Sequence, residues 1–363
     1  MDVMLDDIER LVRCESPSED LAAVARSADT LAELGAERLG VAPERIVLDG
    51  CTHLRWRFGP RPRVLVVGHH DTVWPLGSLD EHPFEVRDGI LRGPGCFDMK
   101  AGVVMALHAI AALGDRDGVT LLVTGDEELG APTSRGLIEA EARAARAALV
   151  LEAAGPAGAL KTERKGLSRY DVLIRGRAAH AGLEPERGVN AAIEAAHQVS
   201  AVVGFGDAAA GTTVTPTRLV AGTTVNTVPA AASFAVDVRA RDAVEQHRVD
   251  ELMRALRPRL VGAEVEVRGG PDRGPLPATA SRDLFARTVR LAGELGLGEP
   301  TAAAVGGVSD GNLTAAVGTP TLDGLGAVGG GAHAADEHVV VAELEPRTRL
   351  LTALLTGLLG GGR

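Results

Sequence analysis

The sequence GHHDTV at Gly68–Val73 decides how the chain is interpreted, because it follows RVLVV at 63–67, an apolar run short enough to be a buried strand. Open α/β sheets place their ligand crevice beyond the carboxyl ends of the strands. Side chains two residues apart on a strand point to the same side, so His69 and Asp71 can face one site. Imidazole binds zinc, and a nearby carboxylate often orients a metal-bound histidine. The pattern therefore allows a metal site or, alternatively, a histidine satisfied within a turn.

Carboxylates recur at the ends of two later apolar runs. The run at 119–124 is followed by GDEELG at 125–130, and the run at 147–151 ends on Glu152. Adjacent carboxylates such as Glu127 and Glu128 repel one another unless a cation or solvent intervenes, so a solvated turn is the simpler alternative. With helices between the strands, this alternation predicts an α/β fold. Its mainly parallel sheet is flanked by helices and carries a site along its C-terminal edge.

Two further candidate residues lie in loops. Asp98 occurs in GPGCFDMK at 93–100, between an expected hairpin that turns at Asp88-Gly89 and an apolar helix near 100–113. An aspartate at such a junction can also be an ordinary helix N-cap. His333 ends the glycine-rich loop GGGAH, before a C-terminal helix expected near 341–360.

The pattern of expected elements changes near residue 167. Four strands and two helices follow in the order strand-helix-strand-strand-helix-strand, which predicts a small α+β sandwich inserted into the first domain. Lys165-Gly166 and the glycine-rich stretch GGPDRG at 269–274 are the expected hinges. We therefore expect one domain formed by residues 1–166 and 275–363 and an inserted domain at 167–274. At the N-terminus, two helices are expected at 2–14 and 19–35, the second with Ser18 as its N-cap.

Composition excludes several classes of function. The 363 residues carry 38 basic and 49 acidic side chains, a net charge of −11 that argues against nucleic-acid binding. The three cysteines lie far apart, without the spacing of a disulfide framework or a zinc knuckle. The first residues are acidic where a signal peptide would be basic, and no apolar stretch approaches the ~20 residues of a membrane span. We expect a soluble, cytoplasmic protein without a membrane partner.

The candidate residues together form a set that suits a pair of divalent metals, zinc first. The set comprises two imidazoles and three carboxylates: His69, Asp98, Glu128, Glu152 and His333. With its motifs in this order, the chain resembles the co-catalytic zinc amidohydrolases that include glutamate carboxypeptidase, acetylornithine deacetylase and succinyl-diaminopimelate desuccinylase. The resemblance covers nearly the whole chain, through GHHDTV, GPGCFDMK, DEELG, Glu152 and the GAH that ends at His333.

The resemblance implies two divalent ions, with cobalt or manganese as alternatives to zinc. It implies that His69 and Glu152 bind one metal and that Glu128 and His333 bind the other. Asp98 would bridge the two metals. Asp71 would orient His69. Glu127 would act as the general base, taking a proton from a water that bridges the metals and returning it to the leaving amine.

The resemblance extends to the inserted domain, where it implies a lid that also forms a homodimer. His180, in GRAAHAG at 176–182, would stabilise the oxyanion, often from the partner subunit. Asn226 and Arg239 would hold the carboxylate of the substrate. The implied activity is hydrolysis of an amide or peptide bond to a C-terminal amino acid, or of an N-acyl amino acid. Cys96-Phe97 departs from the small residues usual before the bridging aspartate, which could narrow the site.

Two other functions are compatible with parts of the sequence. GVSDG at 307–311 matches a nucleophile elbow, and with Asp323 and His333 it gives the residue order of a serine hydrolase. That interpretation leaves the carboxylates at 98, 127, 128 and 152 unexplained. A metal-binding protein without enzymatic activity would be expected to lack the base or a ligand, and all of them are present.

Overall fold

The computed structural model describes residues 1–360, which divide between two compact units. The first unit comprises Met1–Glu163, Leu276–Val305 and the chain from Ser309 onward; the second comprises Arg164–Pro275 with Gly306–Val308. Each unit has its own hydrophobic core. Within residues 1–360, no helix combines the length and the apolar character that crossing a membrane requires.

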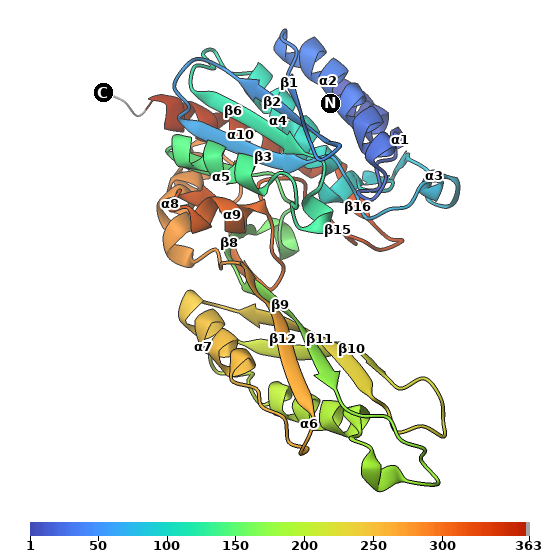
Figure 1. Cartoon of the computed structure of the whole chain (residues 1–363). Helices are drawn as coiled ribbons and strands as arrows, with labels where there is room; N and C mark the ends of the chain where they lie inside the picture. The colour runs from blue at the N-terminus through green and yellow to red at the C-terminus, as the bar shows by residue number, and fades with distance from the viewer. Residues whose placement is uncertain (361–363) are drawn as a thin grey trace. The chain divides into compact units, whose positions relative to one another are not determined.

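The first unit is built on a six-stranded sheet (Figure 1). Its strands, in spatial order, are β1 (Glu44–Leu48), β2 (Cys51–Arg57), β6 (Val119–Thr124), β3 (Val64–His69), β7 (Ala147–Val150) and β14 (Thr321–Leu322). Strands β6, β3, β7 and β14 run parallel, and the pair β1 and β2 is antiparallel. The predicted α/β fold with a mainly parallel sheet is therefore confirmed.

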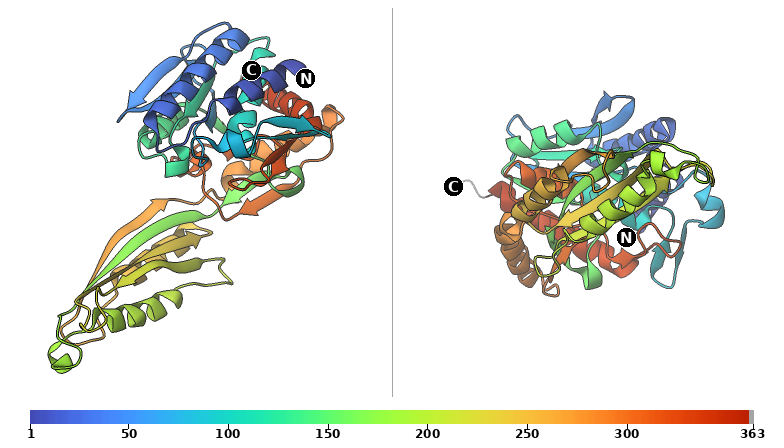
Figure 2. Two further views of the ribbon diagram at one scale, coloured as in Figure 1. Left: turned by 90° about the vertical axis from the view of Figure 1, so that its right-hand side faces the viewer. Right: turned by 60° about the horizontal axis from the view of Figure 1, so that its bottom comes forward.

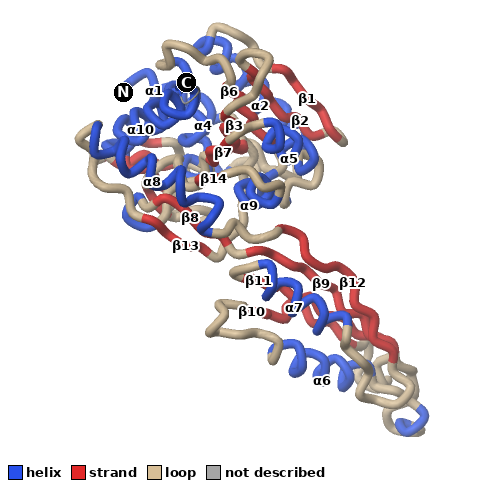
Figure 3. Tube along the Cα trace, turned by 90° about the vertical axis from the view of Figure 1, so that its left-hand side faces the viewer, coloured by secondary structure: helices blue, strands red, loops and turns tan. Residues whose placement is uncertain are grey.

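Helices cover both faces of this sheet. Alternate residues of a strand point to opposite faces, so each face has its own hydrophobic core beneath its helices. Val64 and Val66 of β3 belong to one core, whereas Leu65 and Val67 belong to the other. Figure 3 shows helices α4 and α10 on one side of β3 and α5 on the other. The first core is closed by α1 (Asp2–Arg13), α2 (Leu21–Leu39), α4 (Ala101–Ala111), α8 (Ala278–Glu294) and α10 (Val341–Gly360). The second core is closed by α5 (Arg135–Ala144) and α9 (Asp310–Ala316).

The start of helix α2 differs from the prediction. Asp20, not Ser18, is the N-cap, and its carboxylate accepts hydrogen bonds from the backbone of Ala22 and Ala23. The hydroxyl of Ser18 instead donates to Asp71 Oδ2 at 2.6 Å. Both residue types cap helices well, so position in the tertiary structure decided between them.

A second, four-stranded sheet lies in the loops of the first unit. It contains β15 (Gly329–Gly330), β16 (His338–Val340), β5 (Ile90–Arg92) and β4 (Glu85–Arg87). The β4–β5 hairpin turns at Asp88-Gly89 as predicted, and both turn residues have positive φ, 52° and 77°. Because β16 pairs with β5, the chain after His333 lies beside the chain before Asp98. Further short elements of the unit are α3 (Ser78–Glu81), β8 (Leu160–Arg164), β13 (Ala302–Val305) and the helical turns η1 (Cys96–Lys100), η2 (Glu127–Leu129) and η3 (Pro156–Gly158).

The second unit has the predicted element order. It consists of β9 (Gly166–Arg175), α6 (Ala191–Val203), β10 (Thr213–Ala221), β11 (Ala231–Ala240), α7 (Ala243–Arg254) and β12 (Glu264–Arg273). The antiparallel sheet has the order β10-β11-β9-β12. Val172 and Phe234 of this sheet pack with Ala195 of α6 and Met253 of α7, so both helices cover one face. Figure 2 shows α6 (yellow-green) running along the strands. The role of this unit as a lid or dimerisation domain stays a prediction.

Candidate metal centre

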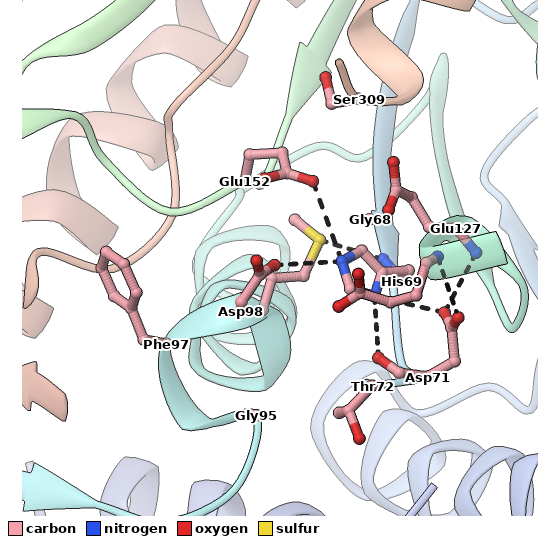
Figure 4. Close-up of polar contacts among 12 residues, drawn as sticks. Gly68, His69, Asp71, Thr72, Gly95, Phe97, Asp98, Glu127, Glu152 and Ser309 are labelled. Carbon is pink, nitrogen blue, oxygen red and sulfur yellow. Dashed lines mark hydrogen bonds and ion pairs between the residues drawn. The ribbon is translucent and has the colours of Figure 1, made fainter. Parts of the chain in front are cut away.

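His69, the last residue of β3, turns one ring nitrogen toward two carboxylates (Figure 4). Its Nε2 lies 3.3 Å from Asp98 Oδ1 and 3.9 Å from Glu152 Oε1. On the other side of the ring, Nδ1 lies 2.9 Å from the backbone oxygen of Asp71 and 3.3 Å from its Oδ1. An oxygen acceptor at Nδ1 fixes the proton there and leaves Nε2 to face the cluster as a ligand.

Asp98 lies between the two imidazoles. While its Oδ1 faces His69, its Oδ2 lies 3.3 Å from Nε2 of His333. The same nitrogen of His333 lies 3.3 Å from Glu128 Oε2. Glu152 thus pairs with His69, and Glu128 pairs with His333. Asp98 therefore contacts both imidazoles, and its role as a bridging ligand stays a prediction.

The donor atoms fit divalent cations. Ligand atoms of His69, Asp98 and Glu128 lie within 4.8 Å of one another, as do those of His69, Glu127 and Glu152. Among the residues that the structure describes, Glu128 Oε1 is buried without a hydrogen-bond partner. Carboxylates packed so closely repel one another unless a positive charge lies between them. Nitrogen and carboxylate oxygen together suit zinc and its first-row neighbours.

The pKa values of the cluster reflect the same charges. Burial disfavours a charged His69, but hydrogen bonds to Asp71 and Asp98 outweigh it and raise the pKa of His69 well above its usual value. Hydrogen bonds to Asp98 and Glu128 raise the pKa of His333 to about 10. For Asp98, burial would raise the pKa, but its bonds to His333 and His69 lower it overall. The negative charge of the carboxylates thus favours a positive charge at both imidazoles, the same preference that would favour a bound cation in the cluster.

Asp71 is fully buried and connects His69 to the turn that carries the two glutamates. Its Oδ1 accepts from the backbone N–H of Glu127 at 3.3 Å, and its Oδ2 accepts from that of Glu128 at 3.2 Å. The hydroxyl of Ser18 donates to Oδ2 as well. The Asp71 carboxylate therefore contacts the imidazole and also fixes the Glu127-Glu128 turn, while its role in orienting a metal-bound His69 stays a prediction.

Sequence reasoning missed the role of Asp126, whose carboxylate holds the far side of that turn. It accepts from the backbone N–H and the hydroxyl of Thr133, both at 2.7 Å, and from the hydroxyl of Ser134. His53 joins this buried network: its Nε2 lies 3.0 Å from the Thr133 hydroxyl, and its Nδ1 accepts from the N–H of Gly125. The threonine and serine that follow DEELG were the available signal, since both are short hydroxyl donors.

A second missed residue is Glu337, four positions after His333. It is buried, and its carboxylate accepts backbone hydrogen bonds from the loop that carries Asp98. The sequence offered only an acidic residue between the glycine-rich loop and the expected C-terminal helix. The three backbone donors to Glu337 are 239 to 242 residues away along the chain.

The three candidate residues of the inserted domain lie in the second unit. His180 and Asn226 are exposed neighbours, joined where the N–H of Ala181 donates to the backbone oxygen of Asn226 at 2.9 Å. Arg239 lies on β11, and its guanidinium forms an ion pair with Asp237 at 2.8 Å. Their predicted roles toward a substrate bound at the metal centre stay predictions.

The geometry does not favour the serine-hydrolase alternative. Ser309 is fully buried, donates from Oγ to Asp323 Oδ2 at 2.6 Å, and accepts from the backbone of Gly311 at the start of α9. His333, the third member of that predicted triad, lies instead against Asp98 and Glu128. Figure 4 shows Ser309 apart from the carboxylate cluster. The hydroxyl acts as a helix cap.

An α/β fold that gathers imidazoles and carboxylates at the ends of its parallel strands is typical of metallohydrolases with a paired-metal centre. The chain belongs to the peptidase family M20/M25/M40, whose family model matches residues 65–357. It is 32% identical over 380 residues to carboxypeptidase G2 of Pseudomonas sp. (strain RS-16), covering 99% of this chain and 90% of the relative. It is 31% identical over 384 residues to succinyl-diaminopimelate desuccinylase of Methylorubrum extorquens (strain PA1), covering 96% of both. These relatives are hydrolases, and so is this protein.

Solved structures share the fold over nearly the whole chain. An M20 family metallo-carboxypeptidase of Sulfolobus solfataricus superimposes with a TM-score of 0.77 at 18% identity, covering 98% of this chain and 99% of that one. A dinuclear metal-binding peptidase of the M20 family from Bacillus subtilis superimposes with a TM-score of 0.66 at 16% identity, covering 99% of both chains. The resemblance to a co-catalytic zinc family, predicted from motifs alone, is thus confirmed at the level of the family.

Proposed function

We propose that this protein uses a pair of divalent metals to hydrolyse an amide or peptide bond whose amine side carries a free carboxylate. The observation that carries the proposal is Asp98, whose two oxygens face the Nε2 atoms of His69 and His333, each at 3.3 Å. The curated relatives support the bond type, since one is named a carboxypeptidase and the other a desuccinylase. Substrates with a C-terminal glutamate, or other N-acyl amino acids, are the first candidates.

The ligand groups divide into two sets around Asp98: His69 with Glu152, and His333 with Glu128. Two divalent ions, zinc first and cobalt or manganese as alternatives, would polarise the scissile carbonyl and lower the pKa of the attacking water. Glu127 lies in the cluster beside the ligand Glu128 and is the proposed general base. Its carboxylate takes a proton from the attacking water and delivers it to the leaving amine. The bond from Asp71 to the Glu127 N–H holds the turn on which that carboxylate lies.

Substrate contacts are assigned to the second unit. His180 is the proposed donor to the oxyanion, and Asn226 and Arg239 are the proposed ligands of the substrate carboxylate. Arg239 already pairs with Asp237, so a bound carboxylate would share its guanidinium rather than meet an isolated cation. Assembly as a homodimer through residues 167–274 and a cytoplasmic location complete the proposal.

The decisive experiment measures metal content and turnover together. Metal-stripped protein is loaded with zinc, cobalt or manganese and assayed against a panel of N-acyl amino acids and dipeptides ending in glutamate. Glu127→Gln should retain two metals per chain and lose at least 10²-fold in kcat, the lower end for general-base catalysis. Glu33→Gln, on an exposed stretch of α2, is the matched control and should behave like the parent.

Two outcomes would contradict the proposal. A Glu127→Gln variant with parental kcat would remove that residue as the base. Activity that persists in chelator and is abolished by a serine-directed phosphonate would instead point to a serine nucleophile. Chelator inactivation that added zinc reverses, without labelling by the phosphonate, is the result we expect.

A further inference from the structure

Glu337 is a buried carboxylate to which the proposed reaction assigns no role. Its side chain lies directly before β16, and the residue is 4% exposed. Oε1 accepts from the backbone N–H groups of Phe97 at 2.9 Å and Asp98 at 3.0 Å. Oε2 accepts from the N–H of Gly95 at 3.0 Å and from the indole Nε1 of Trp74 at 2.6 Å. Both oxygens are therefore fully engaged as acceptors.

The donors share a location: three of the four are backbone groups of the loop that ends at Asp98. Phe97 and Asp98 belong to a short helical turn, Cys96–Lys100, with Gly95 at its N-cap. The first N–H groups of a helical turn have no intrahelical acceptor, and leaving them buried and unpaired is costly. Glu337 supplies that acceptor, and charge-assisted bonds of this kind are stronger than neutral ones. Gly95 is tightly placed as well, because a Cβ on it would lie 2.4 Å from Cγ2 of Thr72, a residue of the GHHDTV stretch.

At its other end, Glu337 closes the turn that carries His333. The N–H of Glu337 donates to the backbone oxygen of Ala334 at 2.9 Å, and the N–H of Ala334 donates to that of Gly331 at 2.9 Å. His333 lies inside this turn with a φ of 62°, a conformation that a non-glycine residue holds only when its surroundings impose it. Glu337 thus contacts the turn of one ligand through its backbone N–H and the segment of another through its carboxylate.

We propose that Glu337 is a positioning residue of the metal centre, which keeps Asp98 and His333 at binding distance from a shared cation. The inference rests on the proposed function, since it concerns the affinity of the centre for its metals. The two ligand groups already lie 3.3 Å apart, from Asp98 Oδ2 to His333 Nε2. If the backbone segments of Asp98 and His333 were mobile, ordering them on metal binding would weaken the affinity for the metal. Residues that hydrogen-bond to the ligand segments reduce this cost because they fix the segments before the metal binds.

Glu337→Gln tests the role with almost no change in volume. The new amide has one acceptor oxygen, and its NH₂ group would face two donors of the present set, so two of the four hydrogen bonds would be lost. Loss of a residue that orients ligands lowers metal affinity by about 10–100-fold. Zinc affinity is measured on metal-stripped protein by competition with a chromophoric chelator, which requires no substrate. We expect at least one of the two sites to weaken by this factor.

The matched control is Glu194→Gln in the second unit. Glu194 is likewise fully buried, and its carboxylate accepts from the backbone N–H groups of Arg259 and Leu260 and from the amide of Gln198. It provides the same chemistry away from the metal ligands. Glu194→Gln should lower the Tm of the stripped protein and leave zinc affinity unchanged. A purely structural role for Glu337 would give the same pattern.

Two outcomes overturn the inference. One is a Glu337→Gln protein that binds both zinc ions as tightly as the parent while its stripped form loses stability. The other concerns Trp74→Phe, which removes only the indole donor and serves as the test if Glu337→Gln does not fold. Unchanged zinc affinity in Trp74→Phe counts against the role. A few-fold loss in Trp74→Phe supports it. Failure of the proposed function is distinguishable, because it appears in the parent protein, as absent metal pairs or absent turnover, whereas the role of Glu337 is measured as a difference in zinc affinity between variant and parent.

Discussion

The ion-pair cluster around Asp7 gives the sharpest prediction for stability. Asp7 on α1 is 1% exposed, and its two oxygens accept from Arg38 of α2 at 2.7 and 2.8 Å. Oδ2 also lies 2.7 Å from Nε2 of His108 on α4. Asp7→Asn removes the charge that joins these three helices while keeping the shape of the side chain.

The expected loss follows from the geometry. Breaking a fully buried pair costs ~3–5 kcal/mol, but the Arg38 side chain is 28% exposed and can be solvated when its partner is neutral. We therefore expect the lower range of a charge-assisted hydrogen bond, about 1.5–3 kcal/mol in the free energy of unfolding. Glu37→Gln is the control, because Glu37 joins the same two helices through an exposed pair with Arg10. It should shift the unfolding curve much less.

The pH dependence has a definite sign. Burial would raise the pKa of Asp7, but hydrogen bonds to Arg38 and His108 outweigh it and hold the pKa below its ordinary value. A carboxyl with a depressed folded-state pKa contributes stability above its unfolded pKa of about 4 and loses it as the pH falls through the folded value. The difference between parent and Asp7→Asn should therefore be largest near neutral pH and narrow below about pH 4.

Urea unfolding followed by tryptophan fluorescence is the assay, performed on metal-stripped protein. Both tryptophans, Trp56 and Trp74, belong to the first unit, so the signal reports the unit that contains Asp7. Equal destabilisation by Asp7→Asn and Glu37→Gln would refute the argument from burial. A difference between parent and Asp7→Asn that stays constant from pH 7 to pH 3 would refute the argument from charge.

Three further predictions concern the metal centre and its surroundings. Asp71→Asn should weaken zinc binding about 10–100-fold in a chelator-competition assay, because the charge that orients His69 is lost; unchanged affinity would contradict this role. Gly326→Ala should lower the free energy of unfolding by about 1–3 kcal/mol, since its Cβ would lie 2.2 Å from the backbone oxygen of Leu151, and an unaltered Tm would count against that contact. Ser309→Ala should cost about 1–3 kcal/mol, because the helix cap and the donor to the buried Asp323 carboxylate are both lost, and should leave kcat within a few-fold of the parent; loss of all turnover would revive the serine-hydrolase alternative.

Much of the first unit could be predicted because its strands are defined by local pattern. The apolar runs that became β3, β6 and β7 are short, continuous and bounded by turn residues, which is the signature of strands buried on both faces. Asp88-Gly89 predicts its hairpin because both positions need positive φ. Where two neighbouring residues were equally suited locally, as with Ser18 and Asp20, local reasoning chose wrongly.

Local sequence pattern was enough to predict the strands β3, β6 and β7, the order of the candidate ligands and the element order of the second unit, since each depends on residues close together along the chain. Local pattern could not show that Asp98 turns one oxygen to each imidazole, nor that Glu337 accepts hydrogen bonds from the segment ending at Asp98. Those contacts join segments up to 242 residues apart, and they depend on strand pairing that no local preference encodes. The physical reason is that a buried carboxylate is stabilised by whichever donors the fold brings to it.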